Sequence, residues 1–214
     1  MSGIEMGHNQ VIVSGILESE FVLFRSMYGE DFYQAELAVC RNSGRIDKIP
    51  ILVSDRLTDV RMCRKGQYVR IIGQFRSYNR QEGEHTRLIL MVFAREITLE
   101  NQEQELQRQA NTIYVDGFLC KEAVYRKTPL GREIADFLVA VNRSFKKTDY
   151  LPCVCWGRNA RYAQTLEVGS HILLWGRIQS RSYRKKIIEG DDINIIERTA
   201  YEVSASRMEC PNPA

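Results

Sequence analysis

The chain has 214 residues and carries 30 Lys and Arg against 27 Asp and Glu, a formal net charge of +3. Hydrophobic residues make up 44% and charged residues 27%, which excludes global disorder, and no apolar run approaches the ~18 residues of a membrane span. Six cysteines behind an N-terminus without a signal peptide predict an intracellular protein with free thiols.

The first half of the chain predicts a β-rich domain. Short segments rich in β-branched and aromatic residues lie at 11–17, 35–41, 50–53, 68–72 and 88–93, separated by turn-forming Gly, Asn and Asp. A glycine at the first segment and another ending the fourth suit a small, strongly bent barrel, because glycine permits the bends. Residues 55–65, between the third and fourth strands, are expected to form a short helix.

The segment at 98–110 (TLENQEQELQRQA) is polar and rich in Gln and Glu. This composition is typical either of a flexible linker or of a short solvated helix. The segment therefore predicts a boundary between one domain over 9–97 and a second over 111–206.

The second half of the chain repeats the first. At an offset of 102, residues 9–17 fall on 111–119, residues 37–41 on 139–143 and residues 50–56 on 152–158. One inserted residue later, 66–73 meets 169–176, and further on 76–78 matches 181–183 and 94–97 matches 200–203. Agreement in this order predicts two copies of one small domain.

Each copy has the order strand, strand, strand, helix, strand, strand, which is the order of an OB-fold. In the second copy the helix is expected over 159–168, ending before Gly169. The sequence therefore predicts an all-β protein of two tandem OB-folds, five-stranded Greek-key barrels, each with one short helix between strands 3 and 4.

Three stretches of the second copy, residues 128–143, 149–160 and 169–177, resemble the bacterial single-stranded-DNA-binding protein (SSB) family. The second copy carries the resemblance in full, and the first copy is a divergent version. The primosomal protein PriB, which shares the fold, is the relative most easily confused with it. The resemblance implies single-stranded DNA as the ligand, bound without sequence preference, in replication, recombination or repair.

Sequence-tolerant binding of single strands needs aromatic rings that stack on bases and cations that follow the phosphates. Tyr150 and Trp156 lie six residues apart on the third predicted strand of the second copy, so a regular strand places both on one face. Cys153 and Cys155 then point into the core. The family pattern has stacking aromatics at the positions of Tyr150, Trp156 and Tyr183. The alternative is that these rings fill the barrel core.

Basic residues cluster in the second copy's hairpin around Tyr183, and their interleaving with an aromatic favours nucleic acid over a merely solvated face. These hairpin cations are Arg177, Arg181, Arg184, Lys185 and Lys186. The candidate DNA-binding set is completed by Arg143 and Arg158, and in the first copy by Arg41, Arg56, Arg76, Tyr78 and Arg80. Lys48 and Ser54 stand where the second copy has Tyr150 and Trp156, so the first copy is expected to bind less tightly.

No enzyme, metal or cofactor is expected. Cys153 and Cys155 form a C-x-C on a predicted strand, and the other four cysteines lack a C-x-x-C spacing. The three histidines are accompanied by no nucleophile motif and no Gly-rich phosphate loop.

The chain ends soon after the second copy, without the long tail and acidic tip typical of bacterial SSBs, which puts partner recruitment by that route in doubt. The family usually presents four OB-folds per assembly, so a homodimer is expected. Two alternatives stay open: a PriB-like primosome accessory that contacts replication or primosome proteins, and a scaffold whose OB surfaces hold a partner protein. The expected location is the cytoplasm, at the nucleoid, with no membrane contact.

Overall fold

The computed structural model describes residues 7–83, 85–100, 111–189 and 192–211, and only the backbone of 185–189 and 192–194. The first copy consists of β1 (Asn9–Leu17), β2 (Val22–Met27), β3 (Glu30–Cys40), β4 (Ile46–Ser54), β5 (Tyr68–Glu82) and β6 (His85–Leu99). The second consists of β7 (Asn111–Leu119), β8 (Val124–Lys127), β9 (Glu133–Arg143), β10 (Lys147–Trp156), β11 (His171–Glu189) and β12 (Asp192–Glu209). Most of 98–110 lies outside the described residues, so the linker and the domain boundaries stay a prediction.

Each copy closes into a barrel of five strands, which confirms the predicted fold class. In the first copy β1 pairs with both β5 and β3, and the ring is completed by β3–β4, the parallel β4–β6 and β5–β6. Each copy also has a sixth strand that the sequence did not predict. In the first copy β2 pairs with the outer edge of β3, and in the second copy β8 pairs with the outer edge of β9. Leu37, Ile49, Ile51, Ile71 and Phe75 are fully buried inside the first barrel, with alternate residues of each strand facing outward.

The helix predicted in both copies forms in only one. In the second copy α2 spans Arg158–Gln164, shorter than expected, and its Ala160 and Ala163 are fully buried against the barrel. The first copy has a 3₁₀ turn, Val60–Met62, in the corresponding place. The second copy's two alanines are the strongest helix formers, whereas the first copy has Thr58, Asp59 and Val60 there, which favour caps and turns.

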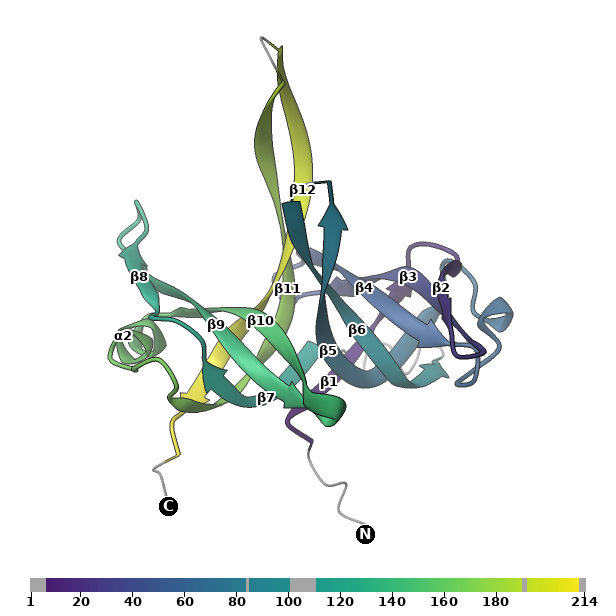
Figure 1. Ribbon diagram of the computed structural model, residues 1–214, viewed down its shortest axis with the longest axis horizontal. Helices are drawn as coiled ribbons and strands as arrows, with labels where there is room; N and C mark the ends of the chain where they lie inside the picture. Colours follow the sequence, from purple (N-terminus) through teal and green to yellow (C-terminus); the bar gives the residue numbers. More distant parts are fainter. Residues whose placement is uncertain (1–6, 84, 101–110, 190–191, 212–214) are drawn as a thin grey trace.

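The hairpins β5–β6 and β11–β12 extend beyond the barrels as a short arm and a long arm on the same side of the molecule (Figure 1). Gly73 pairs with Ala94, 21 residues later, but Gly176 pairs with Ala205, 29 residues later. The long arm therefore contains an eight-residue insertion, and the repeat alignment of 76–78 with 181–183 and of 94–97 with 200–203 was wrong. Phe75 corresponds instead to Ile178, and the positions of β6 correspond to positions of β12 at an offset of 111.

The two copies are joined by an antiparallel pairing of β1 with β7, so that all twelve strands form one sheet (Figure 1). Val11 lies opposite Ile113, and these two residues are themselves equivalent in the repeat. The copies are thus related by a pseudo-twofold axis through this pair. Among the described residues, no helix is long and apolar enough to cross a membrane.

Candidate nucleic-acid interface

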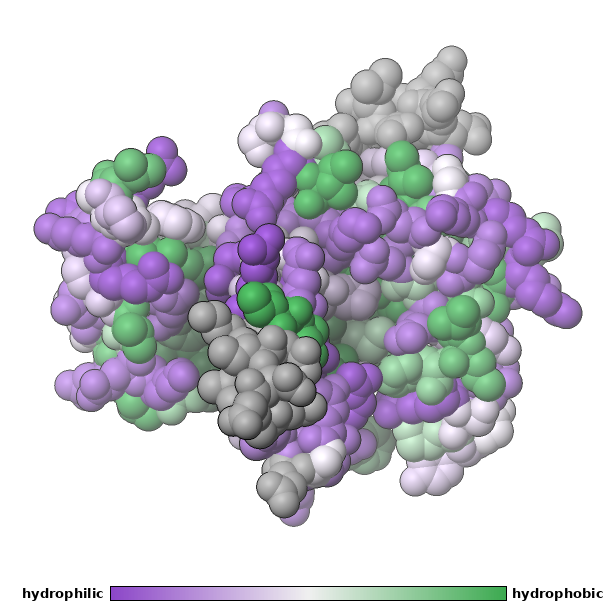
Figure 2. Space-filling model, turned by 90° about the horizontal axis from the view of Figure 1, so that it is seen from above, coloured by the Kyte–Doolittle hydropathy of each residue, from purple (hydrophilic) through white to green (hydrophobic). Residues whose placement is uncertain are grey.

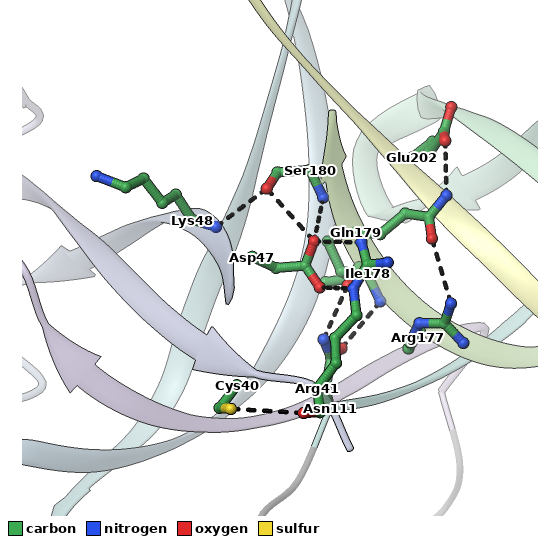
Figure 3. A network of polar contacts seen from close by, with 10 residues as sticks. All are labelled: Cys40, Arg41, Asp47, Lys48, Asn111, Arg177, Ile178, Gln179, Ser180 and Glu202. Carbon is green, nitrogen blue, oxygen red and sulfur yellow. Dashed lines mark hydrogen bonds and ion pairs between the residues drawn. The ribbon is translucent and has the colours of Figure 1, made fainter. Parts of the chain in front are cut away.

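Each arm is fastened to the barrel of the other copy by a buried carboxylate. Asp47 on β4 of the first copy is fully buried, and its Oδ1 accepts a 2.7 Å hydrogen bond from the backbone N–H of Ser180 at the base of the long arm (Figure 3). Lys48 N–H donates to the Ser180 hydroxyl at 3.0 Å. The Arg41 guanidinium grips Asp47 with bonds of 2.5 and 2.6 Å, which raises the pKa of Arg41. We call this contact the Asp47 latch.

The pseudo-twofold axis relates this contact to a second one, which we call the Asp149 latch. Here the second copy provides the carboxylate and the first copy provides the arm. Asp149 on β10 accepts a 2.7 Å hydrogen bond from the Ser77 N–H of the short arm and lies 3.3 Å from Arg143. The Ser77 hydroxyl accepts a 2.7 Å bond from the N–H of Tyr150. Burial raises the pKa of Asp149, although the Ser77 N–H and Arg143 act in the other direction. The backbone at Tyr150, a predicted platform, is thus held by the first copy's arm.

Beside the Asp47 latch lies a cleft of about 540 Å³ between the two copies, which we call the arginine cleft. Six arginines line it: Arg41 and Arg45 from the first copy, and Arg126, Arg132, Arg177 and Arg181 from the second. The sequence reading included Arg41, Arg177 and Arg181 and missed the other three. Seen from the side of the arms, the surface of the molecule is mostly hydrophilic (Figure 2).

The charge of the arginine cleft is only partly neutralised. Asp136 binds Arg126 at 2.9 Å, and Glu202 accepts a 2.7 Å hydrogen bond from Gln179. Arg45, Arg132 and Arg181 are exposed and have no side-chain partner among the described residues. The Nε of Arg177 is buried without a hydrogen-bond partner, and burial together with Arg41 lowers the pKa of Arg177. Such a cluster favours an anionic ligand that would pair with these donors.

Both predicted aromatic platforms on β10 face outward, so the alternative that they fill the core is excluded. Trp156 is 42% exposed and lines the arginine cleft, and Tyr150 is 43% exposed. Cys153 and Cys155 point into the core, as expected, where burial raises the pKa of both thiols. Tyr150 lies six residues from Trp156, about 20 Å along a strand, and does not line the arginine cleft.

A second cleft, of about 620 Å³, lies beside the Asp149 latch. It gathers the predicted Arg76 and Arg143 with Arg95 and Lys147. The Arg76 guanidinium lies 4.0 Å from the centre of the Phe93 ring. Burial, with Arg95 and Arg143, lowers the pKa of Arg76 to about 10. This cleft is again basic and is built from both copies.

Phe145 at the rim of this second cleft is a residue that the sequence reading missed. Its side chain is 93% exposed, and its φ of 62° and the φ of 54° at Lys146 are in the left-handed region. The first copy has Gly44, at φ 79°, in the place of Lys146. Non-glycine residues in this region cost of order 1–3 kcal/mol and cluster at binding sites. The sequence does hold a sign of this turn: the first copy has a glycine, Gly44, at the position where the second copy has Lys146.

The remaining predicted residues lie outside the arginine cleft. Arg158 and Arg184 are exposed, at the start of α2 and on the long arm, and the side chains of Lys185 and Lys186 lie outside the described residues. Tyr183, Tyr78 and Arg80 line a third cleft between the arms. The structure therefore brings together Arg41, Trp156, Arg177 and Arg181 in the arginine cleft, and Arg76 with Arg143 in the second cleft.

In the first copy the residues at the positions equivalent to the platforms are bound to carboxylates. Lys48, in the place of Tyr150, binds Glu18 at 2.6 Å and Glu36 at 3.4 Å. Ser54, in the place of Trp156, donates a hydrogen bond to Glu30, and Glu30 also pairs with the predicted Arg56 at 3.9 Å. Carboxylates thus pair with both the Lys48 ammonium and the Ser54 hydroxyl on this face.

No group of three or more His, Cys, Asp or Glu side chains with metal-site geometry occurs among the described residues. Each of the six cysteines is a free thiol, and Cys63, Cys153 and Cys155 are buried.

Comparison with known proteins gives a consistent result. A model of the single-strand binding protein family matches residues 110–210. Single-stranded DNA-binding protein 3 of Streptococcus agalactiae is 34% identical over 97 residues, covering 42% of this chain and 69% of the relative. Single-stranded DNA-binding protein A of Bacillus subtilis is 34% identical over 100 residues, covering 44% of this chain and 57% of the relative. The chain thus spans a little over half to two thirds of these relatives' lengths.

The fold of the whole chain also has a solved counterpart. The crystal structure of the wild-type single-stranded DNA binding protein from Thermus aquaticus superimposes with a TM-score of 0.72 at 21% identity, covering 97% of this chain and 95% of that one. This likeness shows that the tandem arrangement of two barrels is shared.

Proposed function

The chain belongs to the single-strand binding protein family, and on this premise we propose that it binds single-stranded DNA without sequence preference in the arginine cleft. The family is one of binding proteins, so the chain is not an enzyme. The observation that carries the proposal is the arrangement of six arginines in one cleft that is also lined by an exposed tryptophan. Phosphates pair with the cations, and a base stacks on Trp156, a combination that tolerates any sequence.

The chemistry of the proposed site follows from the side chains that remain unpaired. Arg45, Arg132 and Arg181 are each available to a phosphate, and a guanidinium presents two parallel N–H donors to it. Every base has a π-face, so stacking on Trp156, Tyr150 or Phe145 selects none of them. We include Phe145 and the basic cleft beside it as a second segment of the binding surface.

The finer biological role is part of the same proposal. Coating of exposed strands serves replication, recombination or repair, in the cytoplasm at the nucleoid. The primosome-accessory and scaffold alternatives are favoured by no contact among the described residues, and they would gain weight if strand binding failed.

We further propose a homodimer with four barrels, formed through the outer face of the joined sheet around β1 and β7. Phe118 and Ile16 are 42% and 41% exposed on this face, and the rings of Tyr114 and Trp175 meet there at 5.3 Å. Tyr114 and Trp175 are a cross-strand pair on β7 and β11, and Ile16 and Phe118 are equivalent positions of the repeat on β1 and β7, so a second copy would cover apolar side chains of both copies. Light scattering that returned the mass of one chain across micromolar concentrations would overturn the dimer.

The binding proposal is tested by titrating the protein with oligo-dT and following tryptophan fluorescence at several salt concentrations. The chain has two tryptophans, so a Trp175→Phe variant leaves Trp156 as the sole reporter. We expect quenching on binding and an affinity that falls with salt, with a slope of log K against log[salt] near −0.7 per phosphate contacted. No quenching, or a slope of zero, would contradict binding of phosphates in the cleft.

A further inference from the structure

A carboxylate lies in the middle of the outer face around β1 and β7, where a second copy is proposed to sit. Asp116 faces outward on β7 between Tyr114 and Phe118, and it lies opposite Leu173 of β11. Its immediate neighbours on this face are therefore mostly apolar. In the first copy Ser14 occupies the equivalent position, so only the second copy places a carboxylate here.

Two histidines bind this carboxylate, and we call the three residues (His8, Asp116 and His171) the His–Asp–His cluster. Nε2 of His171 lies 2.7 Å from Oδ1 of Asp116, and Nδ1 of His8, directly before β1, lies 3.2 Å from Oδ2. The His8 carbonyl also accepts a 2.8 Å hydrogen bond from the backbone N–H of Asp116. The His171 ring stacks on Phe118, with the ring centres 5.1 Å apart. Each carboxylate oxygen thus has its own imidazole, and the cluster bridges the joint between the copies.

The two imidazoles keep the Asp116 carboxyl ionised. Burial acts to raise its pKa, but the hydrogen bonds from His171 and His8 outweigh burial, and the pKa of Asp116 is lowered below its usual value. Its side chain is 23% exposed, against 39% for His171 and 67% for His8, so water reaches all three groups in a single chain. A second copy on this face would remove that water. An ionised carboxylate without water costs free energy unless a cation pairs with it.

The other charged groups around the cluster lie on the neighbouring elements. On β12, Arg207 and Glu209 bind each other, and the Arg207 guanidinium lies 4.6 Å from the centre of the Trp175 ring. On β1 the outward-facing Gln10 and Ile12 are uncharged. Further charges are Glu167 in the turn before β11 and the cations of the second cleft, which His8 lines: Arg76, Arg95, Arg143 and Lys147. Among the described residues, the cationic groups within ion-pair distance of Asp116 are the two imidazoles.

The protons on the two imidazoles determine the net charge of the cluster. With one imidazole protonated, its charge balances the carboxylate and the cluster is neutral. With both protonated the cluster carries one positive charge, and with neither it carries one negative charge. Histidine side chains ordinarily change charge between about pH 5 and 8. Because a net charge is costly to bury on an apolar face, a second copy covers the neutral state best.

We infer that the His–Asp–His cluster couples dimer formation to pH, so that the homodimer is strongest near neutral pH and weaker in both acidic and alkaline solution. This coupling rests on the proposed homodimer, whose contact face it concerns. Covering the face favours uptake of the first proton and opposes uptake of the second. Dimer formation therefore takes up protons in alkaline solution and releases them in acid, and by linkage the dissociation constant rises in both directions.

The first experiment measures the dissociation constant of the dimer against pH by sedimentation equilibrium. We expect it to rise roughly 10- to 100-fold from about pH 7 to about pH 5, since a shift of one unit in proton affinity is a factor of about ten for each of two clusters. It should rise again towards about pH 9. His85→Gln is the matched control, because His85 is the third histidine of the chain and is exposed on the short arm. This variant should keep the full pH dependence.

The second experiment separates the charge of the cluster from its packing. A His8→Gln, His171→Gln double variant keeps hydrogen-bond donors but takes up no protons, so its dissociation constant should stay constant between about pH 5 and 8. Asp116→Asn should lose only the alkaline rise, because its cluster is neutral there and carries two positive charges in acid. A merely structural role of Asp116 would not remove one side of the pH profile and keep the other. Circular dichroism checks that each variant is folded.

The outcomes distinguish the proposals. The mass of a single chain at every pH would overturn the homodimer and the pH coupling together, and strand binding would stand. A wild-type dissociation constant that does not change with pH would overturn the coupling alone. So would a pH dependence that survives in the double variant, or one that disappears in His85→Gln.

Discussion

The same face of the two barrels is an open, charged cleft in the second copy and a filled apolar surface in the first. In the first copy Phe32, Leu52 and Met91 are at most 8% exposed, and Phe24, Tyr78 and Phe93 pack against them. The structural register puts Met91 where the second copy has Glu202, and Tyr78 where it has Arg181. One backbone thus supports two opposite surface chemistries.

The difference is concentrated at a few positions, while the frame is kept. Glu30 replaces Arg132, Gln74 replaces Arg177 and Ser54 replaces Trp156, so the first copy lacks the cations and the ring together. Both latches, by contrast, retain an Asp, a Ser and an Arg. The comparison teaches that the first copy contributes to the other copy's cleft as a structural partner, since it supplies Arg41 and Arg45 to it.

The largest effect is expected at the latches, where the copies should behave alike. Asp47→Ala leaves Arg41 without its carboxylate and the Ser180 N–H without an acceptor, so we expect the free energy of unfolding to fall by about 3–5 kcal/mol. Urea unfolding measures it. Glu167→Ala, an exposed carboxylate, is the control and should stay within about 0.5 kcal/mol. If Asp47→Ala lowered the free energy of unfolding no more than Glu167→Ala does, the Asp47 latch would not be a stabilising contact.

The next largest effect separates the copies. Trp156→Ala should cost about 1–3 kcal/mol of oligo-dT binding and leave the melting temperature nearly unchanged, because an exposed ring leaves no core cavity. Ser54→Ala, at the equivalent position, should leave binding unchanged. Normal binding with early unfolding of the Trp156 variant would overturn the assignment of the platform.

A smaller effect concerns the cations that only the second copy has. Arg132→Ala should reduce the steepness of log K against log[salt] by about 0.7, because one phosphate contact is lost. Glu30→Ala, its counterpart in the first copy, should not change the slope. An identical slope in Arg132→Ala and wild type would place the strand elsewhere on the surface.

The smallest effect is the pH dependence of the Asp149 latch. The raised pKa of Asp149 means that the folded state binds the proton more tightly than the unfolded state. Its contribution to stability is therefore full below the unfolded pKa near 3.8 and is lost as the pH rises through the folded pKa. Asp149→Asn should lack this fall in unfolding experiments between about pH 3 and 6. Parallel pH curves for variant and wild type would contradict the shift.

Much of the fold was predictable because local pattern determines it. Segments rich in β-branched and aromatic residues, separated by turn-forming Gly, Asn and Asp, located the barrel strands, and the even spacing of Tyr150 and Trp156 correctly placed both outside the core. The eight-residue insertion in the long arm was missed because a repeated Arg-Ser-Tyr in both arms offered a false match. Only the pairing of Gly73 and Gly176 with their partner strands reveals the true register.

The composition of the site was less predictable, because it depends on contacts between the copies. Arg45 lies in the first copy but lines the second copy's cleft, and nothing in its own segment indicates that neighbour. Phe145 was missed because an isolated Phe in a sequence looks like a core residue, whereas a left-handed turn turns it outward.

The pairing of β1 with β7 has a consequence for how the molecule responds to dilution. Two separate single-barrel chains that paired in this way would dissociate as their concentration fell. Here the partners belong to one polypeptide, so each strand meets the other at an effective concentration that does not depend on how much protein is present. A cleft assembled from both copies therefore stays complete even at the lowest protein concentrations.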